Sequence, residues 1–125
     1  MLTAKPIGRW ETLASPTSFI SVMVGGGVIR EVPFGRTDGN TYGLAVADMN
    51  GDRLPDLVAC NVMQPGTVAL NRSSADSFAS IEFGSAETAS YGLCVADFDA
   101  DGDTDVAVAN SDGVNRIYLN RSTPR

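Results

Sequence analysis

Residues 48–56 have the sequence DMNGDRLPD, and residues 97–105 repeat its pattern as DFDADGDTD. In both loops, oxygen-bearing side chains occupy positions 1, 3, 5 and 9. Alternating carboxylates in a short loop supply most of the oxygen ligands that calcium takes at about 2.3–2.6 Å. Without a cation, these carboxylates would repel one another at short range. The two loops therefore predict two structural metal sites, although Asp- and Asn-rich segments between strands also form plain turns.

The similarity between the two loops extends over most of the chain. Residues 29–76 align without a gap on residues 78–125, which gives a period of 49 residues. A fixed period of about 20–50 residues is typical of stacked or radial repeat architectures. We therefore divide the chain into an N-terminal extension (1–27), a first repeat (28–76) and a second repeat (77–125).

Four segments in each period have the composition of short strands. Apolar runs of small residues flank each loop, and the other segments alternate apolar and polar residues. The predicted strands are 29–34, 44–47, 57–60 and 67–70 in the first repeat and 78–83, 93–96, 106–109 and 116–119 in the second. Four antiparallel strands are the content of one β-propeller blade. We therefore predict an all-β fold of two blades, with a partial N-terminal blade formed by strands at 10–13 and 19–24.

Two blades and a partial blade do not close a ring, since propellers usually need about four to eight. Open blades would leave unpaired strand edges and uncovered apolar faces. One explanation is a homo-oligomer in which two or three chains together close a propeller. The other is that this sequence is a piece of a longer protein, stabilised by dimerisation or strand exchange.

The composition excludes several classes of function. The net charge of −6 comes largely from the two loops, and two bound calcium ions would cancel most of it. Nucleic-acid binding needs clusters of Lys and Arg, which the sequence lacks. No stretch of eighteen apolar residues predicts a membrane span, and residues 1–20 lack the apolar core of a signal peptide. The absence of histidine removes the commonest general base and the usual zinc ligand.

The nearest motif that could be confused with these loops is the EF-hand. It requires a glutamate at loop position 12 and a helix on each side. Position 12 is Ala59 in the first loop and Val108 in the second, and both lie in predicted strands. The EF-hand interpretation therefore fails.

The wider pattern resembles the FG-GAP/VCBS repeat family. The resemblance is carried by Phe-Gly at 34–35 and 83–84, by YGLAVAD and YGLCVAD at 42–48 and 91–97, and by the acidic loops that follow them. The family includes the calcium-binding propeller blades of integrin α-subunits and many bacterial surface proteins. The resemblance covers about residues 29–125. The Gly-Ala-Pro of integrin-type repeats is absent, because Ala-Cys-Asn at 59–61 and Val-Ala-Asn at 108–110 stand in its place.

This resemblance implies a propeller with about two structural Ca²⁺ ions per chain. The implied side-chain ligands are Asp48, Asn50, Asp52 and Asp56 in the first loop and Asp97, Asp99, Asp101 and Asp105 in the second, with the backbone carbonyls of Leu54 and Asp103 at position 7. The second loop has four carboxylates, and Gly102 at position 6 suits a positive φ. The first loop has Arg53 at that position. We therefore expect the second loop to bind calcium more tightly.

Three classes of function remain open. The resemblance and the shortage of catalytic groups favour a non-catalytic binding module that presents loops to a protein or a glycan. A structural, self-assembling scaffold without an external ligand is the alternative. An enzyme is the third, and it would have to use carboxylates, lysine, tyrosine or the metal. The family resemblance also implies an extracellular or cell-surface location.

The two cysteines and two Asn-Arg-Ser sequences each have two interpretations. Cys60 and Cys94 lie in apolar runs and are predicted to be buried free thiols, with a disulfide between them left open. Asn-Arg-Ser at 71–73 and 120–122 fits the N-glycosylation pattern. Because both copies occupy the same repeat position, we favour asparagines that close a strand turn. Arg72 and Arg121 either pair with acidic neighbours or face solvent.

Overall fold

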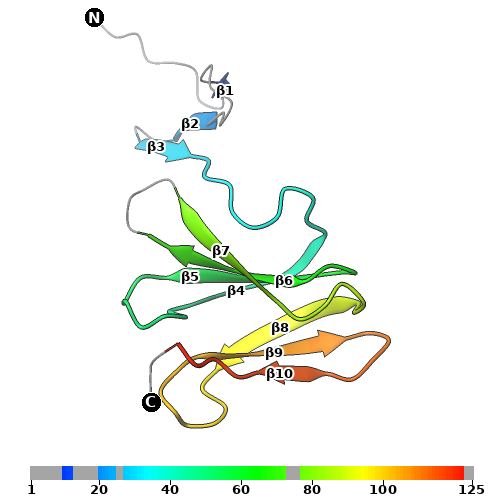
Figure 1. Ribbon diagram of the computed structural model, residues 1–125. Coiled ribbons are helices and arrows are strands. Elements are labelled where there is room, and N and C mark those ends of the chain that lie inside the picture. Colours follow the sequence, from blue (N-terminus) through cyan, green and yellow to red (C-terminus); the bar gives the residue numbers. More distant parts are fainter. Residues whose placement is uncertain (1–9, 13–19, 25–26, 73–76, 123–125) are drawn as a thin grey trace, which may run out of the picture. The chain divides into compact units, whose positions relative to one another are not determined.

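The computed structural model describes residues 10–12, 20–24, 27–72 and 77–122. These residues form ten strands in three antiparallel sheets, and none of them belongs to a helix (Figure 1). The prediction of an all-β fold is confirmed. The chain divides into two compact units, 1–33 and 34–125, which are described separately. Within the described residues, no helix has the length and apolarity needed to cross a membrane.

The first unit contains one three-stranded sheet. It is built from β1 (Trp10–Thr12), β2 (Ile20–Val24) and β3 (Gly27–Arg30), in that order. β1 and β2 match the two strands predicted ahead of the repeats, apart from Leu13 and Phe19, which lie outside the described residues. The predicted strand 29–34 is wrong, because β3 ends at Arg30 and pairs with β2. Pro33 has no backbone N–H to donate to a neighbouring strand, which favours this early end.

The second unit contains two sheets, which Figure 1 shows stacked on each other. The four-stranded sheet has the order β4-β5-β6-β7, and the three-stranded sheet has the order β10-β9-β8. The strands are β4 (Thr41–Ala47), β5 (Asp56–Asn61), β6 (Gly66–Asn71), β7 (Phe78–Phe83), β8 (Ser90–Ala96), β9 (Asp105–Asn110) and β10 (Arg116–Tyr118). Every strand predicted around the two loops is present, and only Leu119 falls outside its strand.

The four-stranded sheet crosses the boundary between the two sequence repeats. Its first three strands come from 28–76, but β7 comes from 77–125 and pairs with β6 along its whole length. Gly66 is required at this pairing because the ring of Phe83 covers it. A Cβ on Gly66 would lie 2.3 Å from the nearest ring atom. The complete four-stranded sheet therefore spans residues 41–83.

The core of the second unit lies between its two sheets. Its buried cluster consists of Met49, Val58, Cys60, Val106 and Val108, and Leu93, Val95 and Tyr118 are among the partly buried residues that pack against it. Apart from Tyr118 in β10, these residues come from strands that flank the acidic loops and, in the case of Met49, from the first loop itself. Each loop is therefore anchored at both ends in one packed core.

Both cysteines are free, but only one is buried. The predicted buried thiol is confirmed for Cys60, and its burial raises the pKa of the thiol. The same prediction is wrong for Cys94, which is exposed. Cys94 pairs with Ala107 on the face of the three-stranded sheet that points away from the core.

Candidate metal centre

Each acidic loop connects two central strands. Loop 1 (residues 48–56) leads from β4 into the first residue of β5, and loop 2 (97–105) leads from β8 into the first residue of β9. The flanking strands are paired up to the loop, from Val46↔Leu57 to Ala47↔Asp56 in the first case. The loops are therefore closed hairpins, and their side chains are held close to one another.

The aspartate at position 1 organises the backbone of its loop. Asp48 Oδ1 accepts hydrogen bonds from the N–H groups of Gly51 (2.8 Å) and Asp52 (3.2 Å), and Oδ2 accepts one from Arg53 (2.7 Å). These bonds, chiefly the one from Arg53, lower the pKa of Asp48. In loop 2, Asp97 accepts from the N–H groups of residues 101 (3.0 Å) and 102 (2.8 Å). Both loops thus fold around the carboxylate at position 1.

The aspartate at position 9 is fully buried in both loops. Asp56 Oδ2 accepts from the N–H of Met49 (2.7 Å), and Oδ1 accepts from the N–H of Asn71 at the end of β6 (2.8 Å). Asp105 makes the same two bonds, to the N–H groups of residues 98 and 120, both at 2.8 Å. This carboxylate ties the loop to the end of the third strand. Each of its oxygens keeps a second lone pair with which it could bind a cation.

The loops share one backbone conformation although their sequences differ. Positions 4 and 6 have positive φ in both loops: Gly51 (78°) and Arg53 (68°) in loop 1, Ala100 (58°) and Gly102 (92°) in loop 2. The sequence placed a glycine at position 6 only in loop 2. The structure shows that Arg53 adopts the same left-handed conformation there, so that departure from the pattern does not change the course of the backbone.

Three carboxylates converge in each loop. Oxygens of Asp48, Asp52 and Asp56 lie within 4.8 Å of one another, and so do those of Asp97, Asp99 and Asp105. Two oxygens bound to the same Ca²⁺ at about 2.3–2.6 Å can be at most about 5 Å apart. These oxygen-only donor sets therefore fit a hard cation of this size.

The other predicted ligands are in the loops but outside these two groups. Asn50 Oδ1 accepts from the N–H of Asp52 at 3.3 Å. At position 7, the N–H groups of Leu54 and Asp103 each donate to the position-5 aspartate, both at 2.9 Å. The side chain of Asp103 is itself buried. The backbone N–H of position 7 therefore bonds to the loop. The group predicted to bind metal is a different one, the backbone carbonyl of the same residue.

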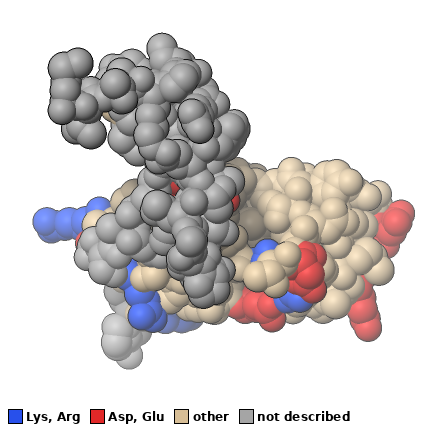
Figure 2. All heavy atoms as spheres, turned by 90° about the horizontal axis from the view of Figure 1, so that it is seen from above, with Lys and Arg blue, Asp and Glu red and all other residues tan. Residues whose placement is uncertain are grey.

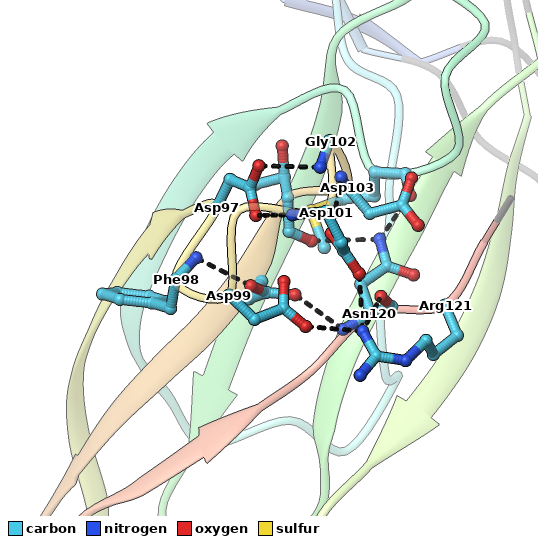
Figure 3. A network of polar contacts seen from close by, with 11 residues as sticks. Asp97, Phe98, Asp99, Asp101, Gly102, Asp103, Asn120 and Arg121 are labelled. Atoms are coloured by element: carbon cyan, nitrogen blue, oxygen red, sulfur yellow. Dashed lines mark hydrogen bonds and ion pairs between the residues drawn. The ribbon is translucent and has the colours of Figure 1, made fainter.

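Loop 2 forms ion pairs with a cationic side chain, so of the two alternatives for Arg121 the pairing with acidic neighbours is the one observed. Arg121 Nη1 lies 2.6 Å from Asp99 Oδ2 and 2.5 Å from Asp101 Oδ2 (Figure 3). These contacts, above all the hydrogen bond to Asp99, raise the pKa of Arg121. Among the described residues, Arg72 forms no corresponding ion pair with loop 1. The single positive charge of Arg121 therefore offsets part of the negative charge of two predicted ligands of loop 2.

The asparagine at the end of each third strand closes its loop. Asn120 Nδ2 donates to the carbonyl of Thr104 (3.0 Å), and Asn71 Nδ2 donates to that of Pro55 (3.1 Å). This confirms the interpretation of these asparagines as strand-closing residues. Asn120 Nδ2 also donates to the carbonyl of Met49 at 2.7 Å, which links the three-stranded sheet to loop 1. This second bond could not be predicted from the sequence, because it joins residues 71 positions apart.

Comparison with known families matches this region. Residues 48–108 match the family model described as FG-GAP-like repeat. This part of the chain is an FG-GAP-like repeat. The matched segment starts at position 1 of loop 1 and ends in β9, so it includes both candidate metal loops. The resemblance to FG-GAP repeats found in the sequence is confirmed for these residues. No curated protein and no solved structure matches the chain.

Proposed function

We propose that this FG-GAP-like repeat protein is a non-catalytic, calcium-binding module whose sheets are blades of a β-propeller. One observation carries the proposal: three carboxylates converge in each of two loops that have positive φ at the same positions, although the third carboxylate is at position 5 in loop 1 and at position 3 in loop 2. A plain turn does not require three carboxylates to meet. Their mutual repulsion is a cost to the fold unless a cation offsets it.

Calcium would be held by oxygen atoms only. The proposed ligands are Asp48, Asn50, Asp52, Asp56 and the carbonyl of Leu54 in loop 1, and Asp97, Asp99, Asp101, Asp105 and the carbonyl of Asp103 in loop 2. A bound ion would neutralise the carboxylates and hold the hairpin rigid. Because both loops end in buried strands, the ion would stabilise the core between the sheets.

The hydrogen bonds of the loops favour a structural role over a catalytic one. Asp48, Asp97, Asp56 and Asp105 each accept two or more backbone N–H groups. A carboxylate whose oxygens are engaged by backbone N–H groups fixes the loop and is poorly placed to transfer protons. The chain also has no histidine.

Protein or glycan surfaces are the partners we propose for the loops of the blades. Nucleic acid fits poorly, because phosphate binding needs clustered Lys and Arg. Arg36 is paired with Asp38 and Glu82, and Arg121 with loop 2. On the face shown in Figure 2, acidic groups lie at the margins of a broad area of described residues without charge.

Calorimetric titration with CaCl₂ tests the metal sites. We expect two bound ions per chain for the unmodified protein and one for either Asp48→Ala or Asp97→Ala. Asp112→Ala is the matched control, since Asp112 is an exposed acid outside both loops and should leave two ions bound. Absence of calcium binding by the unmodified protein would overturn the proposal.

Glycan arrays and pull-down experiments, each with calcium and with EDTA, test the binding role. Calcium-dependent capture of a glycan or protein would support the module. Calcium-dependent stability without capture in either experiment would favour the alternative function, a self-assembling scaffold. That alternative is supported by the large apolar side chains that remain exposed on the outer faces of both sheets.

A further inference from the structure

The 49-residue repeat gives the two sheets of the second unit equivalent faces. Paired residues in an antiparallel sheet share a face. In the four-stranded sheet, Leu44 and Val46 pair with Ala59 and Leu57 and define face 1, and the residues between them define face 2. The equivalent face 1 of the three-stranded sheet contains Leu93, Val95, Val106 and Val108, and its face 2 contains Cys94, Ala107, Ala109 and Ile117.

Within the chain, unlike faces pack together. Val58 and Cys60 on face 2 of the four-stranded sheet belong to the same buried cluster as Val106 and Val108 on face 1 of the three-stranded sheet. Leu93 packs against this cluster. We call this contact between the two sheets the joint. It is heterologous, because face 2 of one sheet packs against face 1 of the other.

Two faces are left open, and each carries apolar residues whose equivalents are covered. On face 1 of the four-stranded sheet, Leu44 is 54% exposed and Val46 is 60% exposed. Their equivalents, Leu93 and Val95, pack against the core. On the same face, Ala59, Thr67 and Ala69 are buried, so the exposed apolar part of face 1 lies on β4.

Face 2 of the three-stranded sheet is open in the same way. Ile117 is 54% exposed, whereas its equivalent Val68 packs against the core. Phe98 in loop 2 is 44% exposed, and its equivalent Met49 is buried in the core. Figure 3 shows Phe98 pointing away from the loop carboxylates. A shallow hollow lined by Cys94, Ala107, Ile117 and their neighbours marks this face.

We propose that a second copy of this chain docks head to tail, with face 2 of one copy's three-stranded sheet on the β4 side of face 1 in the other. The repeat itself points to a second copy as the partner. The open face 1 is equivalent to the face 1 that is covered inside the chain, and the open face 2 is equivalent to the face 2 that covers it. The joint inside the chain also shows the expected contacts at its edge. There Tyr42 and Tyr91 meet edge to face with centroids 5.0 Å apart.

This docking goes beyond the proposed calcium and ligand binding, since it uses strand faces and needs neither metal nor ligand. Because the joint is heterologous, an assembly of two copies still has one open face 1 and one open face 2. Head-to-tail contacts of this type close into a ring when the rotation between copies allows it, and otherwise form filaments. The proposal thus gives a physical basis for the oligomer that the sequence predicted.

Light scattering across a concentration series, in calcium, tests the joint. We expect the mass of the unmodified protein to rise above that of one chain, and Val46→Glu and Ile117→Glu to remain single chains. An equimolar mixture of the two variants should form pairs, because each variant keeps the face that the other has lost. Val114→Glu is the control, since this side chain is 72% exposed in the turn before β10 and should associate normally.

A second measurement needs no substitution. Cys94 lies on the open face 2 and is exposed, whereas Cys60 is buried. We expect alkylation of Cys94 to slow as the protein concentration rises. Single chains at every concentration with constant Cys94 reactivity would overturn the proposal. So would variants that fail to pair in the mixture while circular dichroism shows them folded.

Discussion

At the scale of single residues, the two loops have positive φ at the same positions but place their glycine at different ones. Both need positive φ at positions 4 and 6. Loop 1 uses glycine at position 4 and arginine at position 6, and loop 2 uses alanine at position 4 and glycine at position 6. A side chain in the left-handed region costs roughly 1 kcal/mol relative to glycine. Each loop therefore carries one unfavourable residue that a single substitution can relieve.

The first prediction concerns Ala100. We expect Ala100→Gly to raise the free energy of unfolding by about 0.5–1 kcal/mol, because glycine adopts the left-handed region without a Cβ penalty. Gly102→Ala should lower it by about 1 kcal/mol, and the loss would be conformational, since no atom lies within 4 Å of the added Cβ. Urea unfolding measures both. Ala86→Gly, at an exposed position without positive φ, should destabilise; a gain there would contradict the explanation.

Arg121 provides the second prediction at this scale. Its guanidinium forms ion pairs with both Asp99 and Asp101, so a calcium ion in loop 2 has to compete with it. We expect Arg121→Ala to tighten calcium binding by loop 2 about two- to fivefold, which is the range of an exposed ion pair. Calorimetry in an Asp48→Ala background isolates loop 2. Arg72→Ala in that background should change nothing, and weaker binding by Arg121→Ala would show that the arginine supports the site.

At the scale of elements, the hairpins around the loops followed from the sequence. Apolar runs such as 57–60 and 106–109 beside an acidic turn leave little choice except paired strands. The strand expected at 29–34 was wrong because its partner, β2, lies outside the repeat and pairs only up to Arg30. The exposure of Cys94 could not be predicted either. The sequence of the strand indicates that both of its faces are apolar, but it does not indicate which face is covered by the other sheet. Arg121 was undecided because ion pairing depends on a side-chain conformation.

The buried aspartate at position 9 allows a prediction about one hairpin. Asp56→Ala leaves the N–H groups of Met49 and Asn71 without their acceptor, and each unsatisfied buried group costs about 1–3 kcal/mol. We expect a loss of about 2–5 kcal/mol in EDTA. Asp56→Asn should lose less, since its amide keeps one acceptor oxygen. Thermal unfolding without metal separates this effect from calcium binding, and Asp112→Ala should stay within about 0.5 kcal/mol of the unmodified protein. Equal stability of Asp56→Ala and the unmodified protein would contradict it.

At the scale of the whole second unit, stability depends on which side of a sheet a residue occupies. Val58 and Val46 are both valines in central strands of the same sheet, but Val58 is fully buried and Val46 is 60% exposed. We expect Val58→Ala to cost about 1–3 kcal/mol through lost burial and the cavity it leaves. Val46→Ala should cost less than about 0.5 kcal/mol at concentrations where single chains predominate. Urea unfolding of both variants measures the difference, and similar losses would show that face 1 is already covered.

The offset between sheet and repeat decides how this protein can be divided. A cut between residues 76 and 77, where the sequence repeat ends, would separate β7 from β6, the strand with which it pairs. In a fragment of residues 28–76, β6 would be an unpaired edge strand along its whole length, and such edge strands promote aggregation. A fragment from just before Thr41 to just after Phe83 would keep all four strands together. Expression trials should therefore be designed around the hydrogen-bonded sheet, with the period of the gene set aside.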